Sequence, residues 1–326
     1  MQMWGYALLM LLGLVLAACS PPKNDVDASV PETLSPTPVS PVPSDQLNIY
    51  APASPSSVPV VLAAQQLPNA NVTIYTNHAQ ANTLFLRGDA DFLVTGLSVG
   101  ASMFENGAPV QVVNSFVTDL TYLVTYGQPV ARFADLAGQE IYLPFEGSPA
   151  AEITRFLAEQ DGLVWEEDLK PVYSPFPASL ELLRQGKAKA VVLPEPFVSM
   201  VQDDEQIFVA LNYREAWETQ TGGNSSYPQV AVFVNRDWAA QHSAEIEAFN
   251  QALADAIQTV QQDPVGAIEK TGSAFSFPQP VMLGALQRTG FAPLTDEALA
   301  NNVQQYYQTI GESLNAGFEA FFYHSR

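Results

Sequence analysis

Short apolar runs alternate with segments of helical periodicity from residue 47 onward, and this alternation constrains the fold more than any other feature of the chain. In the first half we expect strands at Leu47–Ala51, Val72–Thr76, Asp91–Thr95 and Val110–Asn114, and helices at Val58–Gln66, Ala79–Arg87 and Ser98–Glu105. Strands and helices that alternate at this spacing predict a parallel sheet with helices on its faces. The fold class is therefore expected to be α/β.

The pattern starts again after Tyr126. Ser148 followed by Pro149 is typical of a helix N-terminus, and that helix is expected to run to Gln160. The other expected elements are a helical turn at Phe133–Leu136 before Gly138, strands at Glu140–Leu143, Pro171–Ser174 and Ala188–Leu193, a helix at Ala178–Gln185, and helical structure beyond Phe197. After a strand at Val230–Val234 we expect only helices, including an apolar stripe from Ile246 to Val260 and a helix at Asp296–Ile310 capped by Thr295.

Two nine-residue segments resemble each other. Residues 86–94 read LRGDADFLV, and residues 184–192, which begin 98 residues later, read RQGKAKAVV. Each combines a helix end, a glycine and a buried strand, although shared folding constraints produce such a match without duplication. We assign residues 47–124 and 230–326 to lobe 1 and residues 125–229 to lobe 2. A ligand cleft is expected between the lobes, beyond the carboxyl ends of the strands.

The N-terminus has the form of an export signal. Ala7–Ala18 is apolar and uncharged, which suits a signal peptide and is short for a membrane span. It ends in Leu16-Ala17-Ala18-Cys19, which resembles the bacterial lipoprotein cleavage site. No Lys or Arg precedes the run, so an uncleaved N-terminal anchor is the alternative. We expect residues 1–19 to be a signal peptide, Cys19 to carry lipid, and the protein to be anchored to the outer face of the cytoplasmic membrane.

Residues 20–46 contain seven prolines and no aromatic residue. Such a segment cannot build a core and favours extended conformations, so we expect it to be a tether.

Composition excludes several classes of function. The chain has 34 Asp and Glu against 13 Lys and Arg, and a net charge of −21 repels nucleic acid. Cys19 is the only cysteine, so the rest of the chain has no disulfide, cysteine metal site or cysteine nucleophile. Three scattered histidines form no metal-binding pattern, and we expect no metal and no cofactor.

The loops that follow the strands supply candidate ligand contacts. To the residues of these loops we add Tyr122 and Tyr227, which lie near the two segments expected to cross between the lobes. The candidate ligand-binding residues are Ser54, Asn77, His78, Thr95, Ser98, Phe116, Tyr122, Phe145, Glu146, Ser148, Tyr173, Phe176, Glu195, Phe197 and Tyr227.

These candidates include many aromatic residues and neither Lys nor Arg. The set predicts a planar heterocycle, such as a pyrimidine or a flavin, held between aromatic walls with Glu146 and Glu195 accepting hydrogen bonds. The alternative is an anion of the taurine, sulfonate or nitrate type, bound at helix N-termini near Ser98 and Ser148. For any single aromatic residue, core packing is the competing interpretation.

Gly96-Leu97-Ser98-Val99-Gly100 matches the G-x-S-x-G pattern of serine hydrolases. An exported serine hydrolase using Ser98 is therefore an alternative of another class, with His242 and His324 as the later histidines. The competing interpretation is that Ser98 caps a helix. Because no HGGG-like oxyanion segment is present, we predict that the protein is not an enzyme. A ligand-sensing surface lipoprotein is a further alternative.

Four stretches of the second half carry a family resemblance. Asp135–Ile141 (DLAGQEI), Gly147-Ser148-Pro149, Leu193–Phe197 (LPEPF) and Tyr227–Val230 (YPQV) resemble, in order and spacing, segments of periplasmic solute-binding proteins. With the lipoprotein-like start, the chain resembles the NMT1/THI5-like group, which includes thiamine-precursor, riboflavin, taurine, sulfonate and nitrate binders.

The resemblance spans about residues 47 to 270 and implies a two-lobed type II periplasmic-binding fold whose cleft closes on a ligand. It implies a small-molecule ligand and, as partners, an ABC permease with its ATPase. We expect a monomer. Enzymes of this fold in the pyrimidine synthase branch use cysteine-rich sequence, from which this chain departs.

Overall fold

A six-stranded sheet forms the first half of the fold in the computed structural model, which describes residues 46–223, 227–312, 314–315 and 317–325. Its strand order is β11-β4-β10-β3-β1-β2. The strands are β1 (Leu47–Pro52), β2 (Ala70–Tyr75), β3 (Phe92–Gly96), β4 (Val110–Asp119), β10 (Val230–Asn235) and β11 (Gly290–Leu294). Strands β2, β1 and β3 are parallel, and β10 runs antiparallel between β3 and β4.

A five-stranded sheet of order β7-β6-β8-β5-β9 forms the second half. Its strands are β5 (Thr121–Tyr126), β6 (Gln139–Leu143), β7 (Leu169–Tyr173), β8 (Ala190–Pro194) and β9 (Ile207–Asn212). β6 is parallel to β7 and β8, and β5 runs antiparallel between β8 and β9. The two sheets therefore share an arrangement of five strands: three parallel strands, then one antiparallel strand that the chain enters on passing from the other sheet (β10 or β5), then a fifth strand.

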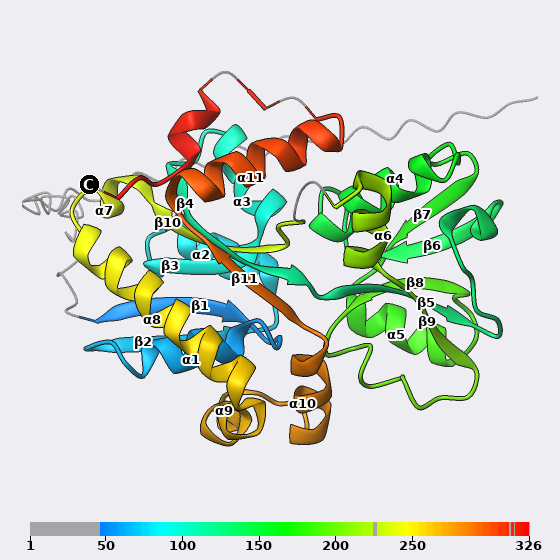
Figure 1. The fold of residues 1–326 in the computed structure, drawn as a ribbon, viewed down its shortest axis with the longest axis horizontal. Coiled ribbons are helices and arrows are strands. Elements are labelled where there is room, and N and C mark those ends of the chain that lie inside the picture. The colour runs from blue at the N-terminus through cyan, green and yellow to red at the C-terminus, as the bar shows by residue number, and fades with distance from the viewer. Residues whose placement is uncertain (1–45, 224–226, 313, 316, 326) are drawn as a thin grey trace, which may run out of the picture. The chain divides into compact units, whose positions relative to one another are not determined.

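Helices cover both sheets (Figure 1). The helices are α1 (Ser57–Ala64), α2 (His78–Leu86), α3 (Leu97–Glu105), α4 (Pro149–Gln160), α5 (Phe176–Arg184), α6 (Tyr213–Thr221), α7 (Arg236–Ala239), α8 (Ser243–Gln262), α9 (Pro264–Thr271), α10 (Gln279–Gln287) and α11 (Asp296–Thr309), with 3-10 turns at Phe133–Leu136, Gly272–Ala274 and Phe318–Phe321. We call the six-stranded sheet with the helices that cover it the six-stranded lobe, and the five-stranded sheet with its helices the five-stranded lobe. None of the helices in the described residues is both long and apolar enough to span a membrane.

The internal similarity extends to whole elements. α5 and β8 each begin 98 residues after α2 and β3, and they have the same lengths. Gly88 and Gly186 follow the two helices with φ of 85° and 65°. In both places the next residue's N–H reaches back to a carbonyl five positions earlier, from Asp89 to Leu84 and from Lys187 to Leu182. This is the Schellman helix end, which favours glycine because of the positive φ.

Three apolar clusters form the core. One lies between the six-stranded sheet and α1, α8 and α9, and the apolar stripe of α8 from Ile246 to Val260 is buried there as predicted. A second lies between the five-stranded sheet and α5. The third runs through both lobes, where the rings of Trp217 (α6), Tyr227 and Tyr306 (α11) lie with centroids 5.5–5.9 Å apart.

The expected elements are largely confirmed. Ser148 is the N-cap of α4 and its Oγ accepts a hydrogen bond from the Ala151 N–H at 3.1 Å. The lobe boundaries after residues 124 and 229 stay predictions, and they fall inside β5 and at the start of β10. The predicted signal peptide, Cys19 and nearly all of the tether lie outside the described residues.

Two expectations about the later chain were wrong. The segment beyond Phe197 is a series of turns followed by β9, not a helix, because β9 completes the five-stranded sheet by pairing with β5. The chain after Val234 is not wholly helical, because β11 pairs with the edge of β4. β11 contains Gly290 and Pro293, residues that weaken a strand signal and are tolerated at a sheet edge.

Candidate functional site

A cavity of about 550 Å³ lies between α3 of the six-stranded lobe and α4 of the five-stranded lobe. The loop that precedes α4 contributes Phe145, Glu146 and Gly147, and the C-terminal part of α11 contributes Tyr307. Each of the two helices follows a strand of a parallel set, so the cavity lies at the carboxyl ends of strands. Its volume is in the range of small-molecule sites.

The N-termini of α3 and α4 meet at one end of this region. A Cβ atom on Gly96 would lie 2.5 Å from Cγ of Pro149, so the two helices approach through a glycine and a proline ring. The first N–H of α3, on Leu97, donates to the carbonyl of Gln229 at 3.0 Å. Tyr227 OH donates to the Pro149 carbonyl at 3.3 Å. The closest approach of the two helices is therefore held by residues from three different parts of the chain.

Carboxyl groups and aromatic rings dominate the cavity wall. Glu105, Glu146, Glu152, Glu166 and Glu312 line it, together with Phe145, Trp165, Tyr173 and Tyr307. The lining residues that the structure describes include one cation, Arg155. Its Nη2 lies 2.6 Å from Glu312 Oε1, so this guanidinium already has an anionic partner.

Glu152 has the most perturbed carboxyl in the cavity. Burial and the negative charge of Glu312 raise its pKa from 4.5 to about 8, although Arg155 and the hydroxyls of Ser98 and Tyr306 oppose this rise. Tyr306 OH donates to Glu152 Oε2 at 3.3 Å. A carboxyl with such a pKa is protonated in much of the unliganded protein at neutral pH, and an incoming positive charge would favour its ionised form.

Two buried hydroxyls in the cavity wall lack normal hydrogen bonds. Tyr307 is 5% exposed and its OH has no hydrogen-bond partner among the described residues. Ser98 is 4% exposed, and its Oγ makes no hydrogen bond of normal geometry, although it lies near enough to Glu152 to lower the pKa of that carboxyl. Because buried hydroxyls are normally paired, both are available to a bound molecule.

Four of the predicted ligand-binding residues line this cavity: Ser98, Phe145, Glu146 and Tyr173. Phe145 and Tyr173 are both 41% exposed, which is unusual for large apolar rings and consistent with an open wall. Ser148 is buried beside them as the cap of α4.

A second predicted group gathers around Arg288, at another contact between the lobes. Glu195, whose side chain is fully buried, lies 3.4 Å from Arg288 Nη1 and accepts a hydrogen bond from the Ser199 N–H at 3.0 Å. Tyr122 OH donates to the Arg288 carbonyl at 3.0 Å. The ring of Phe197 lies between those of Phe176 and Phe277, at centroid distances of 5.7 and 6.0 Å. These residues join α10 to the loop after β8 and do not line the cavity.

The remaining candidates lie elsewhere. Phe116 is fully buried inside β4, within the core beneath α1 and α8. Tyr227 is buried against Trp217 and Tyr306. The hydroxyl of Ser54 forms a hydrogen bond with that of Ser56, and Asn77 is the N-cap of α2. The ring of His78 packs on that of Tyr75, and Thr95 is buried in β3.

The G-x-S-x-G segment has a packing explanation. Gly96 contacts Pro149, and a Cβ atom on Gly100 would collide with the ring of Phe233. Ser98 is the second residue of α3 and Gly96 is the N-cap, so the expected capping role of Ser98 was wrong. His242 stacks on Trp238 and bonds its carbonyl at 2.8 Å, and His324 lies near Asp296. Among the described residues, no three His, Cys, Asp or Glu side chains form a group suited to a metal ion.

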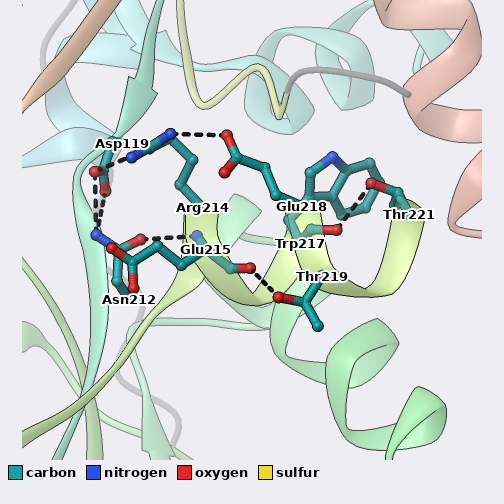
Figure 2. A network of polar contacts seen from close by, with 8 residues as sticks. All are labelled: Asp119, Asn212, Arg214, Glu215, Trp217, Glu218, Thr219 and Thr221. Atoms are coloured by element: carbon teal, nitrogen blue, oxygen red, sulfur yellow. Dashed lines mark hydrogen bonds and ion pairs between the residues drawn. The ribbon is translucent and has the colours of Figure 1, made fainter. Parts of the chain in front are cut away.

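A polar network anchors the direct passage from one lobe to the other (Figure 2). Asp119, which ends β4, is followed by Leu120 and then by β5 of the other sheet. Its carboxylate accepts hydrogen bonds from Asn212 Nδ2 at 3.1 and 3.2 Å and from Arg214 Nε at 3.3 Å. Arg214 also bonds Glu218 at 2.7 Å. Burial raises the pKa of Asp119, although Asn212 and Arg214 oppose the rise.

The family described as NMT1/THI5 like matches residues 69–267, which is more than half of the chain. The chain belongs to the NMT1/THI5-like family. Among curated proteins, none has significant sequence similarity to it.

Solved structures share the fold of this NMT1/THI5-like protein. The aliphatic sulphonate binding protein SsuA from Escherichia coli aligns with a TM-score of 0.69 at 16% identity, over 87% of this chain and 93% of that chain. The ligand-binding component of an ABC-type import system from Staphylococcus aureus aligns with a TM-score of 0.72 at 10% identity, over 86% and 97%. The alkanesulfonate-binding protein SsuA from Xanthomonas axonopodis pv. citri, bound to MOPS, aligns with a TM-score of 0.63 at 19% identity, over 81% of this chain and 93% of that chain. The expected two-lobed periplasmic-binding fold is thus confirmed.

Sequence reasoning did not select Glu152, Arg155, Tyr307 or Glu312 of the NMT1/THI5-like chain. The rule of strand ends points to loops that follow strands, whereas Glu152 and Arg155 lie along α4, and Tyr307 and Glu312 lie in and just after the last turn of α11. One signal was available for Glu152. It lies four residues after the Ser148 cap, in the first turn of a helix that begins at a strand end, and faces the same way as the cap.

Proposed function

We propose that this protein is the extracytoplasmic solute-binding component of an ABC importer, which captures a small molecule between its lobes and delivers it to the permease. Membership of the NMT1/THI5-like family and the fold shared with binding proteins of import systems support this proposal. The observation that carries it is the cavity bounded by α3 of one lobe and α4 of the other. A molecule bound there contacts both lobes, so its binding energy favours the closed arrangement that a permease recognises.

The proposal includes no chemical step and no cofactor. Ser98 lies near the carboxyl of Glu152 and lines the same cavity as Tyr307 of α11, and these surroundings suit recognition of a ligand. On the sequence-based hypothesis the ligand is a planar heterocycle such as a pyrimidine or a flavin, with a taurine, sulfonate or nitrate anion as the alternative. The aromatic rings of Phe145, Trp165 and Tyr173 in the cavity wall favour a ligand with a flat or apolar body.

The proposal also includes export and anchoring through lipid on Cys19, as the sequence Leu16-Ala17-Ala18-Cys19 predicts. Replacing Cys19 with Ser is expected to abolish incorporation of a labelled fatty acid and to release the protein from the membrane fraction. A Cys19→Ser protein that still incorporates label would overturn the anchoring, while leaving the solute-binding role to be tested separately.

Capture of a solute is tested directly by mass spectrometry. The purified full-length chain is incubated with a metabolite extract, washed and denatured, and the released molecules are identified. We expect one class of small molecule to be enriched near one per chain. Ser102→Trp, which introduces a large ring at an exposed lining residue of α3, is expected to abolish the enrichment.

Gln258→Trp provides the matched control, because Gln258 is an exposed residue of α8 away from the cavity. It is expected to retain the wild-type enrichment. Enrichment of no molecule by the wild-type chain, or equal enrichment by wild type and Ser102→Trp, would contradict the proposal.

A further inference from the structure

The charge of the cavity restricts the class of ligand more than its shape does. Five glutamates line it, and carboxyl groups outnumber the positive groups of the described lining by four. The one cation, Arg155, is bound to Glu312 at 2.6 Å. An anionic ligand entering this space would have to displace that carboxylate and approach the others, which is unfavourable in a site partly shielded from water.

Protein groups already use part of the anion-binding capacity of the two helix N-termini. The first N–H of α3, on Leu97, already donates to Gln229. α4 begins with Pro149, which has no N–H, and the N–H of Ala151, two residues later, donates to the Ser148 side chain. The two N-termini also meet each other through Gly96 and Pro149. Protein groups therefore occupy part of the usual site for an anion at these two helix starts.

Two observations independent of the acidity indicate that the cavity receives a polar molecule. Tyr307 and Ser98 line it, both are more than nine-tenths buried, and their hydroxyls complete no normal hydrogen bond within the part of the chain that the structure describes. Each hydroxyl accepts hydrogen bonds through its lone pairs and donates one through its hydrogen. A ligand carrying N–H groups would supply donors to these two oxygens and to the carboxyl of Glu152 together.

The uncharged part of the wall suits the body of such a ligand. Phe145 and Tyr173 are each 41% exposed, and Trp165 is half-buried beside the same cavity. Aromatic faces attract positive charge as well as apolar surface, and tryptophan does so most strongly. Carboxylates and aromatic rings together form the surroundings that favour an organic cation over a neutral or anionic molecule.

We propose that the ligand captured in this cavity is a small organic cation, such as a protonated amine or a positively charged nitrogen heterocycle. Its charged nitrogen lies against Glu152, with Ser98 and Tyr307 as further acceptors, and its apolar body lies against Phe145, Trp165 and Tyr173. This inference rests on the proposed solute-binding function and specifies its ligand class. A cationic ligand would distinguish this protein from the sulphonate-binding proteins that share its fold.

Three probes that share one ring test the proposal: benzylammonium, benzyl alcohol and phenylmethanesulfonate. Binding of each to the full-length chain is measured at neutral pH by ligand-observed NMR, which detects millimolar affinities. We expect benzylammonium to bind and to bind at least about tenfold more tightly than the other two. Glu152→Gln is expected to weaken its binding at least about tenfold, because the anionic partner is lost while the side-chain shape is kept.

Glu159→Gln is the matched control, because it makes the same change at an exposed residue of the same helix outside the cavity. It is expected to bind benzylammonium as the wild type does. Thermal unfolding of all three proteins shows whether Glu152→Gln is folded. Tighter binding of the sulfonate or the alcohol, or no binding of benzylammonium at all, would overturn the cation proposal. The extract experiment would still decide whether the chain is a solute-binding protein.

Discussion

Gly96 and Pro149 touch across the two lobes, at the point where the N-termini of α3 and α4 meet. Gly96 has an ordinary φ of −64°, so its backbone does not require glycine. Space does, because a Cβ atom there would lie 2.5 Å from Pro149 Cγ and 3.0 Å from Cδ. A proline ring is rigid and cannot turn aside. The lobes therefore reach this arrangement only while residue 96 lacks a side chain.

Gly96→Ala is expected to destabilise the protein by about 1–3 kcal/mol through this overpacking. Because the collision is between lobes, we also expect solute capture to weaken. Calorimetry measures the first effect and the extract experiment the second. Gly284→Ala is the matched control: Gly284 is inside α10, and a Cβ atom there meets its nearest neighbour, Ser199 Oγ, at 3.4 Å, an ordinary contact. A Gly96→Ala protein as stable and as active in capture as Gly284→Ala would contradict the interpretation.

The acidity of Glu152 predicts how binding depends on pH. Its pKa is raised to about 8, chiefly by burial, and a cation binds best to the ionised carboxylate. Benzylammonium affinity is therefore expected to rise about tenfold per pH unit on approaching pH 8 from below, and to level off above it. Titration at pH 6, 7 and 8 checks this expectation. The same series on Glu152→Gln should show little change, and an equal slope in both proteins would assign the effect to another group.

The groups around Glu152 affect the size of this dependence but not its sign. Ser98 faces it from α3, Tyr306 and Tyr307 from α11, Tyr227 from the return to β10, and Arg155 and Glu312 form an ion pair nearby. Burial raises the pKa of all three tyrosines well above their ordinary value, so they stay neutral over this range.

Much of the fold could be predicted because its signals are local. Gly88 and Gly186 mark helix ends that need positive φ, and the Ser148-Pro149 pair marks a helix start. β9 and β11 were missed because pairing with distant strands decides them. The segment that contains β9 was expected to be helical, and its pairing with β5 makes it a strand, whereas β11 carries glycine and proline. Local sequence contains no information about those partners.

The candidate site was predictable only close to the strand ends. Phe145 and Glu146 follow β6, Tyr173 ends β7, and Ser98 is the second residue of the helix after β3; all four line the cavity, as the rule of strand ends predicts. The same rule selected Phe116, because β4 was expected to end at Asn114, whereas it continues to Asp119 and places the ring in the core. Glu152 and Tyr307 were missed because the direction in which a helix faces its partner lobe depends on how the lobes pack.

The ion pair of Arg288 and Glu195 is a second contact between the lobes whose contribution to stability can be tested. Arg288→Met leaves the buried Glu195 carboxyl without its cation and is expected to destabilise the protein by about 1–3 kcal/mol at neutral pH. Burial already raises the pKa of Glu195, and removal of the guanidinium raises it further. The folded chain then holds a proton that the unfolded chain releases, so the deficit of Arg288→Met should grow as the pH rises from 5 to 8.

Thermal unfolding of Arg288→Met, Glu195→Gln and the double variant at pH 5 and pH 8 measures this dependence. Glu195→Gln removes the titrating group, so the double variant should recover part of the stability at pH 8 and lose the added pH dependence. A deficit for Arg288→Met that is the same at both pH values would show that lost packing, not charge, explains the effect.

Asp119 and Glu218 share Arg214 as a partner. A comparison of the two carboxylates therefore isolates the contribution that burial of such a group makes to the free energy of unfolding. Asp119 is 7% exposed and accepts from both Asn212 and Arg214, whereas the Glu218 side chain is 47% exposed. Asp119→Ala is expected to destabilise the protein by about 1–3 kcal/mol, because two polar side chains lose their acceptor at the passage from β4 to β5. Glu218→Ala removes an exposed partner and is expected to change stability by no more than about 1 kcal/mol. Urea unfolding of both variants tests the difference, and equal effects would mean that Arg214, not the burial of Asp119, determines the strength of this network.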